Sequence, residues 1–96
     1  MESVTITRHD LGSHGEYQAH VAGNEHIGRL TWVTRDNARV AEHTLVPPEI
    51  GGRGIAGKLV DALITDAKTQ GFKIVPECSY IAAAFAKHAK WADLRV

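Results

Sequence analysis

The spacing of apolar residues changes near Pro47, and this change constrains the fold more than any other feature. Before it, four short segments alternate apolar and polar residues with the period of two that half-buried strands show. These segments are residues 3–8, 16–21, 27–35 and 39–46, and turn-forming stretches separate them. From Ile55 the apolar residues recur at helical spacing, and Gly71 is placed as the residue that ends the helix.

The remaining chain reads as a short buried strand over residues 73–78 and an alanine-rich helix over residues 80–88. Because a helix connects the fourth and fifth strands, that crossover makes the two strands parallel. We therefore predict an α+β fold in one domain spanning residues 1–96. It consists of a four-stranded antiparallel meander, a β-α-β crossover and a C-terminal helix.

Composition excludes several classes of protein. The formal net charge is zero, which gives the whole chain no electrostatic footprint for nucleic acid or for an acidic membrane. No apolar run approaches the ~20 residues that a membrane span needs, and the first ten residues do not resemble a signal peptide. The single cysteine, Cys78, fits a reducing compartment. We expect a cytoplasmic protein that binds neither nucleic acid nor membrane.

The glycine-rich stretch GGRGIAGKL (51–59) resembles two familiar phosphate-binding patterns, but the chain lacks a feature that each of them requires. The triphosphate-binding loop needs Ser or Thr after its Lys to hold Mg²⁺, and Leu59 cannot do so. The dinucleotide pattern G-x-G-x-x-G is present, and Glu77 lies where a ribose-binding acid is expected. That fold, however, requires two parallel βαβαβ halves, whereas here an antiparallel meander precedes the motif.

The same stretch still has the properties of an anion site. The helix that begins near Ile55 lacks Ser, Thr, Asp or Asn at its N-cap and lacks an acidic residue in its first turn. Arg53 and Lys58 add positive charge, and the glycines allow a ligand to approach the backbone closely. These features favour phosphate; the alternative is a flexible glycine turn with cations facing solvent.

Three prolines indicate where the sheet opens. Pro47 and Pro48 end the fourth strand, and Pro76 lies in the fifth, so pairing of these parallel strands should fail near Val46 and Pro76. The strands would then splay beside the glycine loop and leave backbone groups of residues 44–46 unpaired. An extended chain with amide groups and a pyrophosphate end fits this slot, and coenzyme A is such a molecule.

The glycine loop resembles the [QR]-x-x-G-x-[GA] signature of the GNAT superfamily of acetyl-CoA-dependent N-acetyltransferases, which aligns with residues 51–56. The segments EHTLVPPEIGGRGIAGKLV (42–60) and GFKIVPECSYIAAAF (71–85) resemble a minimal GNAT-like subfamily of about a hundred residues. One departure is Gly51, which stands where the superfamily has Gln or Arg, so a contact from that side chain is lost.

The resemblance implies specific sites for acetyl-CoA. The pantetheine arm would lie along the backbone of Thr44, Leu45 and Val46, with an N–H near Val46 polarising the thioester carbonyl. The pyrophosphate would lie on the loop and first helical turn, formed by Gly51, Gly52, Arg53, Gly54, Ile55, Ala56, Gly57 and Lys58. Lys87 and His88, on the last helix, are candidates for the 3′-phosphate.

The subfamily also carries a His before the loop and a Cys at the end of the fifth strand, here His43 and Cys78. On neighbouring strands near the splay, they are expected to approach each other and the thioester. Three roles stay open for them: base, nucleophile, or lining of the site. Without the resemblance, Cys78 reads as a small buried apolar residue.

We therefore expect an acetyl-CoA-dependent N-acetyltransferase acting on an unidentified amine, present as a monomer or weak homo-oligomer. The alternative is a coenzyme A-binding sensor or interaction module without robust catalysis. No metal is expected, because the histidines before residue 30 lack zinc-ligand spacing and a second cysteine is absent; they are His9, His14, His20 and His26.

Overall fold

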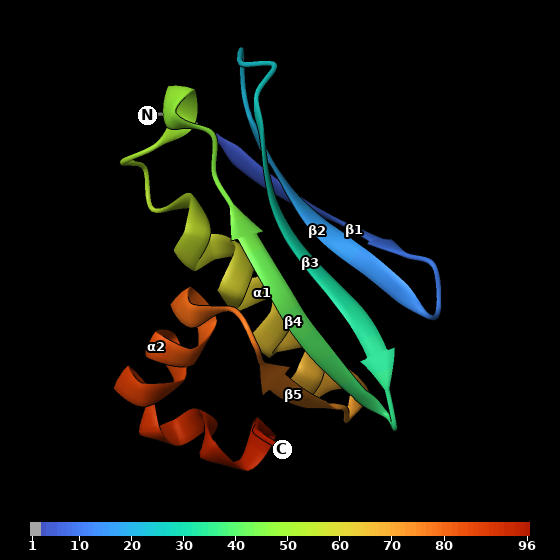
Figure 1. Ribbon diagram of the computed structural model, residues 1–96. Helices are drawn as coiled ribbons and strands as arrows, with labels where there is room; N and C mark the ends of the chain where they lie inside the picture. The colour runs from blue at the N-terminus through green and yellow to red at the C-terminus, as the bar shows by residue number, and fades with distance from the viewer. Residues whose placement is uncertain (1–2) are drawn as a thin grey trace.

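A computed structural model describes residues 3–96 and has the predicted architecture of one mixed sheet with helices (Figure 1). The strands follow the order β1-β2-β3-β4-β5, so each pairs with its neighbour in the chain. Their bounds are β1 Val4–Asp10, β2 His14–Val21, β3 Ile27–Arg35, β4 Ala38–Leu45 and β5 Lys73–Pro76. The first four form the antiparallel meander, and β5 is parallel to β4. The predicted α+β fold is confirmed.

Helix α1 (Ile55–Gln70) covers one face of the meander, and the core lies between them. Its buried residues are the predicted apolar stripe, namely Ile55, Leu59, Val60, Leu63, Ile64 and Ala67. They pack against strand side chains on the face of the sheet that α1 covers, among them Tyr17, Ala19 and Leu30. Gly71 ends the helix with φ of 81°, as predicted, and its N–H donates to the carbonyl of Ala67.

The start of α1 lies directly on β3 at Gly28. A Cβ placed on Gly28 would come within 2.9 Å of Ile55 Cγ2 and 3.5 Å of Leu59 Cδ1. Only a residue without a side chain allows this separation between helix and sheet. The position of the helix N-terminus above the sheet is therefore set by a close contact that the sequence pattern alone does not reveal.

Helix α2 (Ser79–Lys87) follows β5, and a 3-10 segment, η2 (Ala89–Leu94), completes the chain around it. The ring of Phe85 is buried and meets Trp91 edge to face with centroids 5.6 Å apart. A second short 3-10 helix, η1 (Pro48–Ile50), precedes the glycine loop and buries Ile50. None of the described helices is both long and apolar enough to cross a membrane.

Several predicted boundaries differ from the structure. Strands β1 and β2 extend two residues further toward each other than expected, because the ladder continues to the pair Asp10↔Gly15 and leaves only residues 11–13 for the turn. The fifth strand ends at Pro76 rather than at Cys78. The reason is that the N–H groups of Glu77 and Cys78 both donate to the carbonyl of Ala41, which turns the chain away from β4.

Candidate active site

The pairing of β4 with β5 stops well before β4 ends. The last pair is Ala41↔Pro76, and β4 continues to Leu45 with β3 as its strand neighbour. Proline at this position cannot donate a ladder hydrogen bond, which agrees with the end of pairing there. The strands therefore separate as predicted, but the opening begins at residue 42, four positions earlier than expected on the β4 side. Residues 42–45 form an edge of β4 that faces away from β3.

The glycine loop lies immediately beyond this opening, between η1 and α1 (Figure 1). Gly52 and Gly54 both have φ of 72°, a left-handed conformation that residues with side chains rarely adopt. Gly54 is the N-cap of α1; no side chain caps the helix, and its first turn contains no acidic residue. The N–H groups at this end therefore lack side-chain acceptors, and they present partial positive charge.

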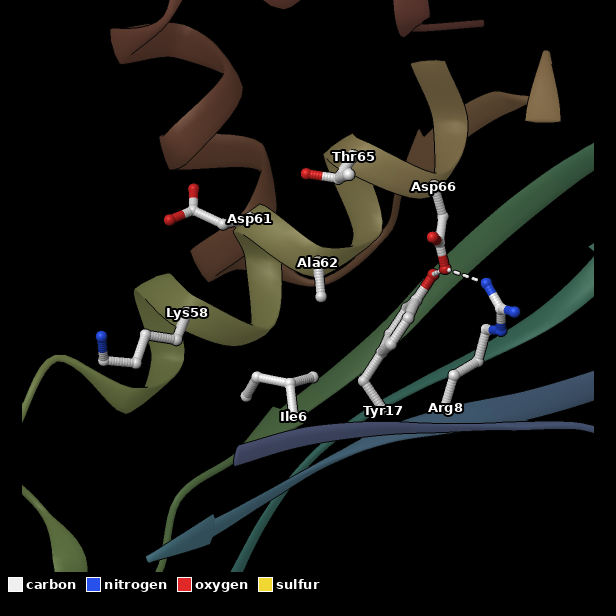
Figure 2. Close-up of a pocket in the computed structure, with 8 residues that line it drawn as sticks. All are labelled: Ile6, Arg8, Tyr17, Lys58, Asp61, Ala62, Thr65 and Asp66. Carbon is white, nitrogen blue, oxygen red and sulfur yellow. Dashed lines mark hydrogen bonds and ion pairs between the residues drawn. The ribbon is translucent and has the colours of Figure 1, made fainter. Parts of the chain in front are cut away.

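The two cations of the loop are placed differently. Arg53 is exposed, and its guanidinium donates to the carbonyl of Glu49 at 3.4 Å. Lys58 is exposed on α1 and lines a hollow between α1 and β1, together with Asp61 and Ile6 (Figure 2). Both cations thus belong to the loop end of α1, as the sequence indicates.

Helix α2 begins beside this loop. The hydroxyl of Tyr80 lies 4.0 Å from the position that a Cβ on Gly57 would occupy. Tyr80 and Lys87 are separated by two helical turns and lie on the same side of α2. Together with Ala83, Ala84 and His88 they line a hollow of about 280 Å³. Lys87 and His88 are both exposed, and they lie on the side of α2 whose first turn, at Tyr80, is next to the loop.

Cys78 lies at the N-cap position of α2, partly buried, next to β4. Its Sγ is 3.6 Å from Oγ1 of Thr44. Burial raises the pKa of the Cys78 thiol, but hydrogen bonds outweigh this effect and lower the pKa below its ordinary value. The groups that can donate to the thiolate are, in decreasing order of effect, the backbone N–H of Ile81, the Thr44 hydroxyl, and the backbone N–H groups of Tyr80 and Thr44. In the neutral form the thiol donates to Thr44 Oγ1 instead. The start of α2 thus stabilises the thiolate relative to a cysteine in water.

His43 and Cys78 do not meet, contrary to expectation. Thr44 is paired with Leu30, whose side chain is buried beneath the helices, whereas His43 is paired with Thr31 on the opposite face. Because successive side chains of a strand point to opposite faces, Thr44 turns toward Cys78 and His43 turns away. The structure brings Thr44, not His43, to the thiol.

A β-bulge gives the open face of the sheet a second polar residue. Trp32 is paired with Ala41 and Thr31 with His43, so Glu42 has no partner on β3. Glu42 and Thr31 line one hollow of about 520 Å³ on the face away from α1. Glu42 and His43 are therefore consecutive residues on the same face, an arrangement that bulges produce next to functional sites. No sequence signal identified this bulge.

A partly buried polar network joins α1 to the sheet away from the loop, and Figure 2 shows three of its residues, Arg8, Tyr17 and Asp66. The Tyr17 hydroxyl donates to Asp66 at 2.7 Å and accepts from Arg39 at 2.8 Å, and Arg8 forms an ion pair with Asp66 at 2.9 Å. Burial, followed by the hydrogen bond to Asp66, raises the pKa of Tyr17. The Arg39 guanidinium lies between the rings of Trp32 and Phe72. This network fixes α1 against β1 and β2.

Comparison with known families identifies the family of this chain. The profile of the GCN5-related N-acetyltransferase family matches residues 16–94, which is most of the chain. The chain belongs to this family. Membership of this family supports acetyl transfer as the general chemistry of the chain. Among residues 3–96, no group of three His, Cys, Asp or Glu side chains is arranged to hold a metal ion.

Proposed function

We propose that this GCN5-related N-acetyltransferase transfers an acetyl group from acetyl-CoA to an amine that is still to be identified. The observation that carries the proposal is the end of β4–β5 pairing at Ala41↔Pro76 next to an uncapped helix N-terminus. An extended amide-bearing arm can add to the edge of β4 as a strand would. Its phosphate end then reaches the N–H groups of α1.

The loop fits a pyrophosphate for a steric as well as an electrostatic reason. A Cβ on Gly52 or Gly54 would have no atom within 4 Å, so neither glycine is needed for packing within the chain. Both are required by the backbone, which has φ of 72° at each of them. We assign the pyrophosphate to residues 51–58, including the side chains of Arg53 and Lys58. We assign the 3′-phosphate to Lys87 and His88, on the face of α2 that begins beside Gly57.

The acyl end of the cofactor would lie at the strand opening. The pantetheine arm follows the edge formed by Thr44, Leu45 and Val46, and a backbone N–H near Val46 polarises the thioester carbonyl. The residues beside this opening belong to both faces of the sheet. On the face away from the helices lies His43, exposed and beside Glu42. On the helix face lie Cys78 and Thr44.

This division between faces favours direct transfer. The acceptor approaches over the open face, and the imidazole of His43 takes a proton from the ammonium group of the acceptor. The amine nitrogen attacks the carbonyl carbon, an N–C bond forms and the C–S bond breaks, and coenzyme A leaves as a thiolate that then takes up a proton. Cys78 lines the acyl end from the other face. Because His43 faces away from it, His43 does not serve as the base for Cys78.

Calorimetric titration with acetyl-CoA, with NADH and ATP as controls, tests the assignment of the ligand. We expect binding of acetyl-CoA in preference to both nucleotides, because only acetyl-CoA has an arm that can pair with β4. Preference for either control, or no binding of acetyl-CoA, would refute the proposal.

Turnover of the wild type, His43→Ala and Cys78→Ala distinguishes an enzyme from a coenzyme A-binding module. Thioester cleavage with an amine panel should fall in His43→Ala by about 10²–10⁴-fold, the usual contribution of a general base. Equal, near-background rates in all three proteins would instead identify a binding module.

Intact mass after incubation with acetyl-CoA tests the covalent route. An acetyl adduct that Cys78→Ser abolishes would replace direct transfer with an acyl-cysteine intermediate.

A further inference from the structure

The hollow of about 520 Å³ that Glu42 and Thr31 line lies on the face of the sheet away from α1, and its volume is within the range of ligand pockets. Its lining comes from all four strands of the meander and from the turn after β1, where Leu11 contributes. Neighbouring strands lie about 4.8 Å apart, so roughly 14 Å separate β4 from β1. The hollow is therefore long in the direction across the strands.

Strand pairing places His43 at the β4 end of this hollow. His43 is paired with Thr31, and Thr31 is paired with Glu16. Because paired residues share a face of the sheet, these three side chains form a row across the open face. Thr31 and Glu16 line the hollow, as does Glu42, the neighbour of His43 at the bulge. The proposed base thus lies where the hollow meets the strand opening.

The acidic residues of the lining are Glu16 and Glu42, and the lining contains no Lys or Arg. Glu16 forms an ion pair with Arg29 and accepts a hydrogen bond from the side-chain amide of Gln18. Glu42 is partly buried and has no ion-pair partner among residues 3–96. Charges that are removed from water are usually paired in proteins. The hollow therefore favours a ligand with one positive charge, placed at Glu42.

The opposite end of the hollow is apolar. Val33 and Leu11 line it, and Leu11 is 70 % exposed, so a bound carbon chain would remove apolar surface from water here. The histidines at this end, His9 and His14, each form a hydrogen bond with a neighbouring hydroxyl. This end thus offers apolar contact and no unpaired carboxylate for a second cation.

Thr31 provides an independent indication of a ligand. Its hydroxyl oxygen is buried, and no group within residues 3–96 forms a hydrogen bond with it. Buried polar atoms without a partner are few in folded proteins and require an explanation. Rotation about the Cα–Cβ bond of Thr31 would bring the hydroxyl into the hollow that this residue lines, where it can accept a hydrogen bond from an ammonium group at Glu42.

We propose that this hollow binds the acceptor, and that the acceptor is a primary amine with one positive charge and an apolar body. Its ammonium group lies between Glu42 and Thr31 beside His43, and its carbon chain extends toward Val33 and Leu11. The inference rests on the proposed function, because it takes the hollow as the acceptor side of acetyl transfer. Glu42 binds the ammonium form, the proton passes to His43, and the neutral nitrogen attacks the thioester carbonyl while coenzyme A leaves as the thiolate.

Three amines of matched length test the chemical class. Hexylamine, 1,6-diaminohexane and 6-aminohexanoate share the reactive ammonium group and end in a methyl, a second ammonium or a carboxylate group. Their dissociation constants are measured with coenzyme A present, from the NMR shifts of the amides of residues 31–33 and 42–43, so that no turnover is needed. We expect hexylamine to bind most tightly, and butylamine to bind about fourfold more weakly per missing methylene. A diamine or amino acid that binds as tightly as hexylamine, or shifts confined to other residues, would overturn the proposal.

Two variants and a matched control test the residues. Glu42→Gln should weaken hexylamine binding by about tenfold, because a charge-assisted hydrogen bond is lost. Leu11→Ser should weaken it by about fourfold or more, the effect of one buried methylene. Val96→Ser is the control for Leu11→Ser, since Val96 is 73 % exposed and lies outside the hollow, and it should leave binding unchanged. The NMR spectrum shows whether each variant is folded. Unchanged binding in folded Glu42→Gln or in folded Leu11→Ser would overturn the proposal.

Acetylation of the same amines by acetyl-CoA separates this inference from the proposed function. A higher kcat/KM for hexylamine than for the other two amines supports both. Acetylation with another order of kcat/KM would overturn the inference alone. Binding of hexylamine in the hollow without acetylation of any amine would contradict the proposed function and, with it, the role of the hollow as an acceptor site.

Discussion

Gly57 is the residue at which the requirements of the helix and of the proposed ligand conflict. It lies in the first turn of α1, where Ala is a better helix former by about 1 kcal/mol. An added Cβ would meet the Tyr80 hydroxyl at 4.0 Å, an ordinary contact. Gly57→Ala should therefore raise the free energy of unfolding in urea by up to about 1 kcal/mol.

The same substitution should weaken acetyl-CoA binding, because the methyl group occupies space next to the pyrophosphate. Overpacking of about 1–3 kcal/mol corresponds to a loss of affinity of about 5-fold to 150-fold, measured by calorimetry. The stability measurement on the same sample is the internal control. A variant that is more stable and binds acetyl-CoA as well as wild type would move the pyrophosphate away from Gly57.

Thr44 should control the reactivity of Cys78. Hydrogen bonds to the sulfur, including one from the Thr44 hydroxyl, lower the pKa of the thiol below its ordinary value of 9.0 despite burial. The alkylation rate with iodoacetamide should thus reach its half-maximum below pH 9.0. Thr44→Val removes a donor to the thiolate, so the pKa should rise and the rate at pH 7 should fall while the high-pH plateau is kept. Thr65→Val, on the exposed side of α1, should change neither; a downward shift in Thr44→Val would contradict the assignment.

Among the elements, the bounds of α1 could be predicted from the sequence, whereas the position of α1 above the sheet could not. The apolar stripe and Gly71 define the bounds of the helix because both signals are local. The height of the helix above the sheet depends on Gly28, which lies in a strand where glycine has no local reason to occur. Contacts between distant residues decide such packing, and periodicity carries no information about them.

Gly28 and Ile55 should therefore be coupled. Gly28→Ala places a methyl group 2.9 Å from Ile55 Cγ2, which forces α1 away from β3 and should cost about 1–3 kcal/mol in the free energy of unfolding. Ile55→Leu removes the Cγ2 branch, so the double variant should recover part of this loss. Urea unfolding of the two single variants and the double variant measures the coupling. Additive losses would show that the helix does not move against this methyl group.

The candidate site shows the same division between local and distant information. The uncapped start of α1 and the prolines are local signals, and both agree with the structure. The contact of Cys78 with Thr44 rather than His43 depends on the strand face, which the bulge at Glu42 and the pairing with β3 determine. A register shift of one residue exchanges the faces of a strand, so the sequence could not decide between the two.

At the scale of the whole molecule, the proposed ligand site lies at one end of the strand order. The opening lies at β4 and β5, whereas β1 is the first strand at the far edge of the sheet. Two meander strands, β2 and β3, separate the two, and α1 contacts all four strands of the meander. Direct contact with the ligand can therefore be distinguished from a general stabilisation of the fold by a measurement that reports on individual residues.

Amide hydrogen exchange with and without acetyl-CoA makes that separation. A ligand at 100 times its Kd stabilises the folded state by about 2.7 kcal/mol, which slows amides that exchange by global unfolding about 100-fold. Amides of residues 42–46 and 51–58 exchange by local opening, so they should gain additional protection from direct contact with the arm and the pyrophosphate. The amides of Ile6 and Arg8, on the far edge of the sheet, should gain none of this additional protection. ATP should protect the loop at most, because it has no arm to pair with β4. Protection that excludes residues 42–46 would place the ligand outside the strand opening.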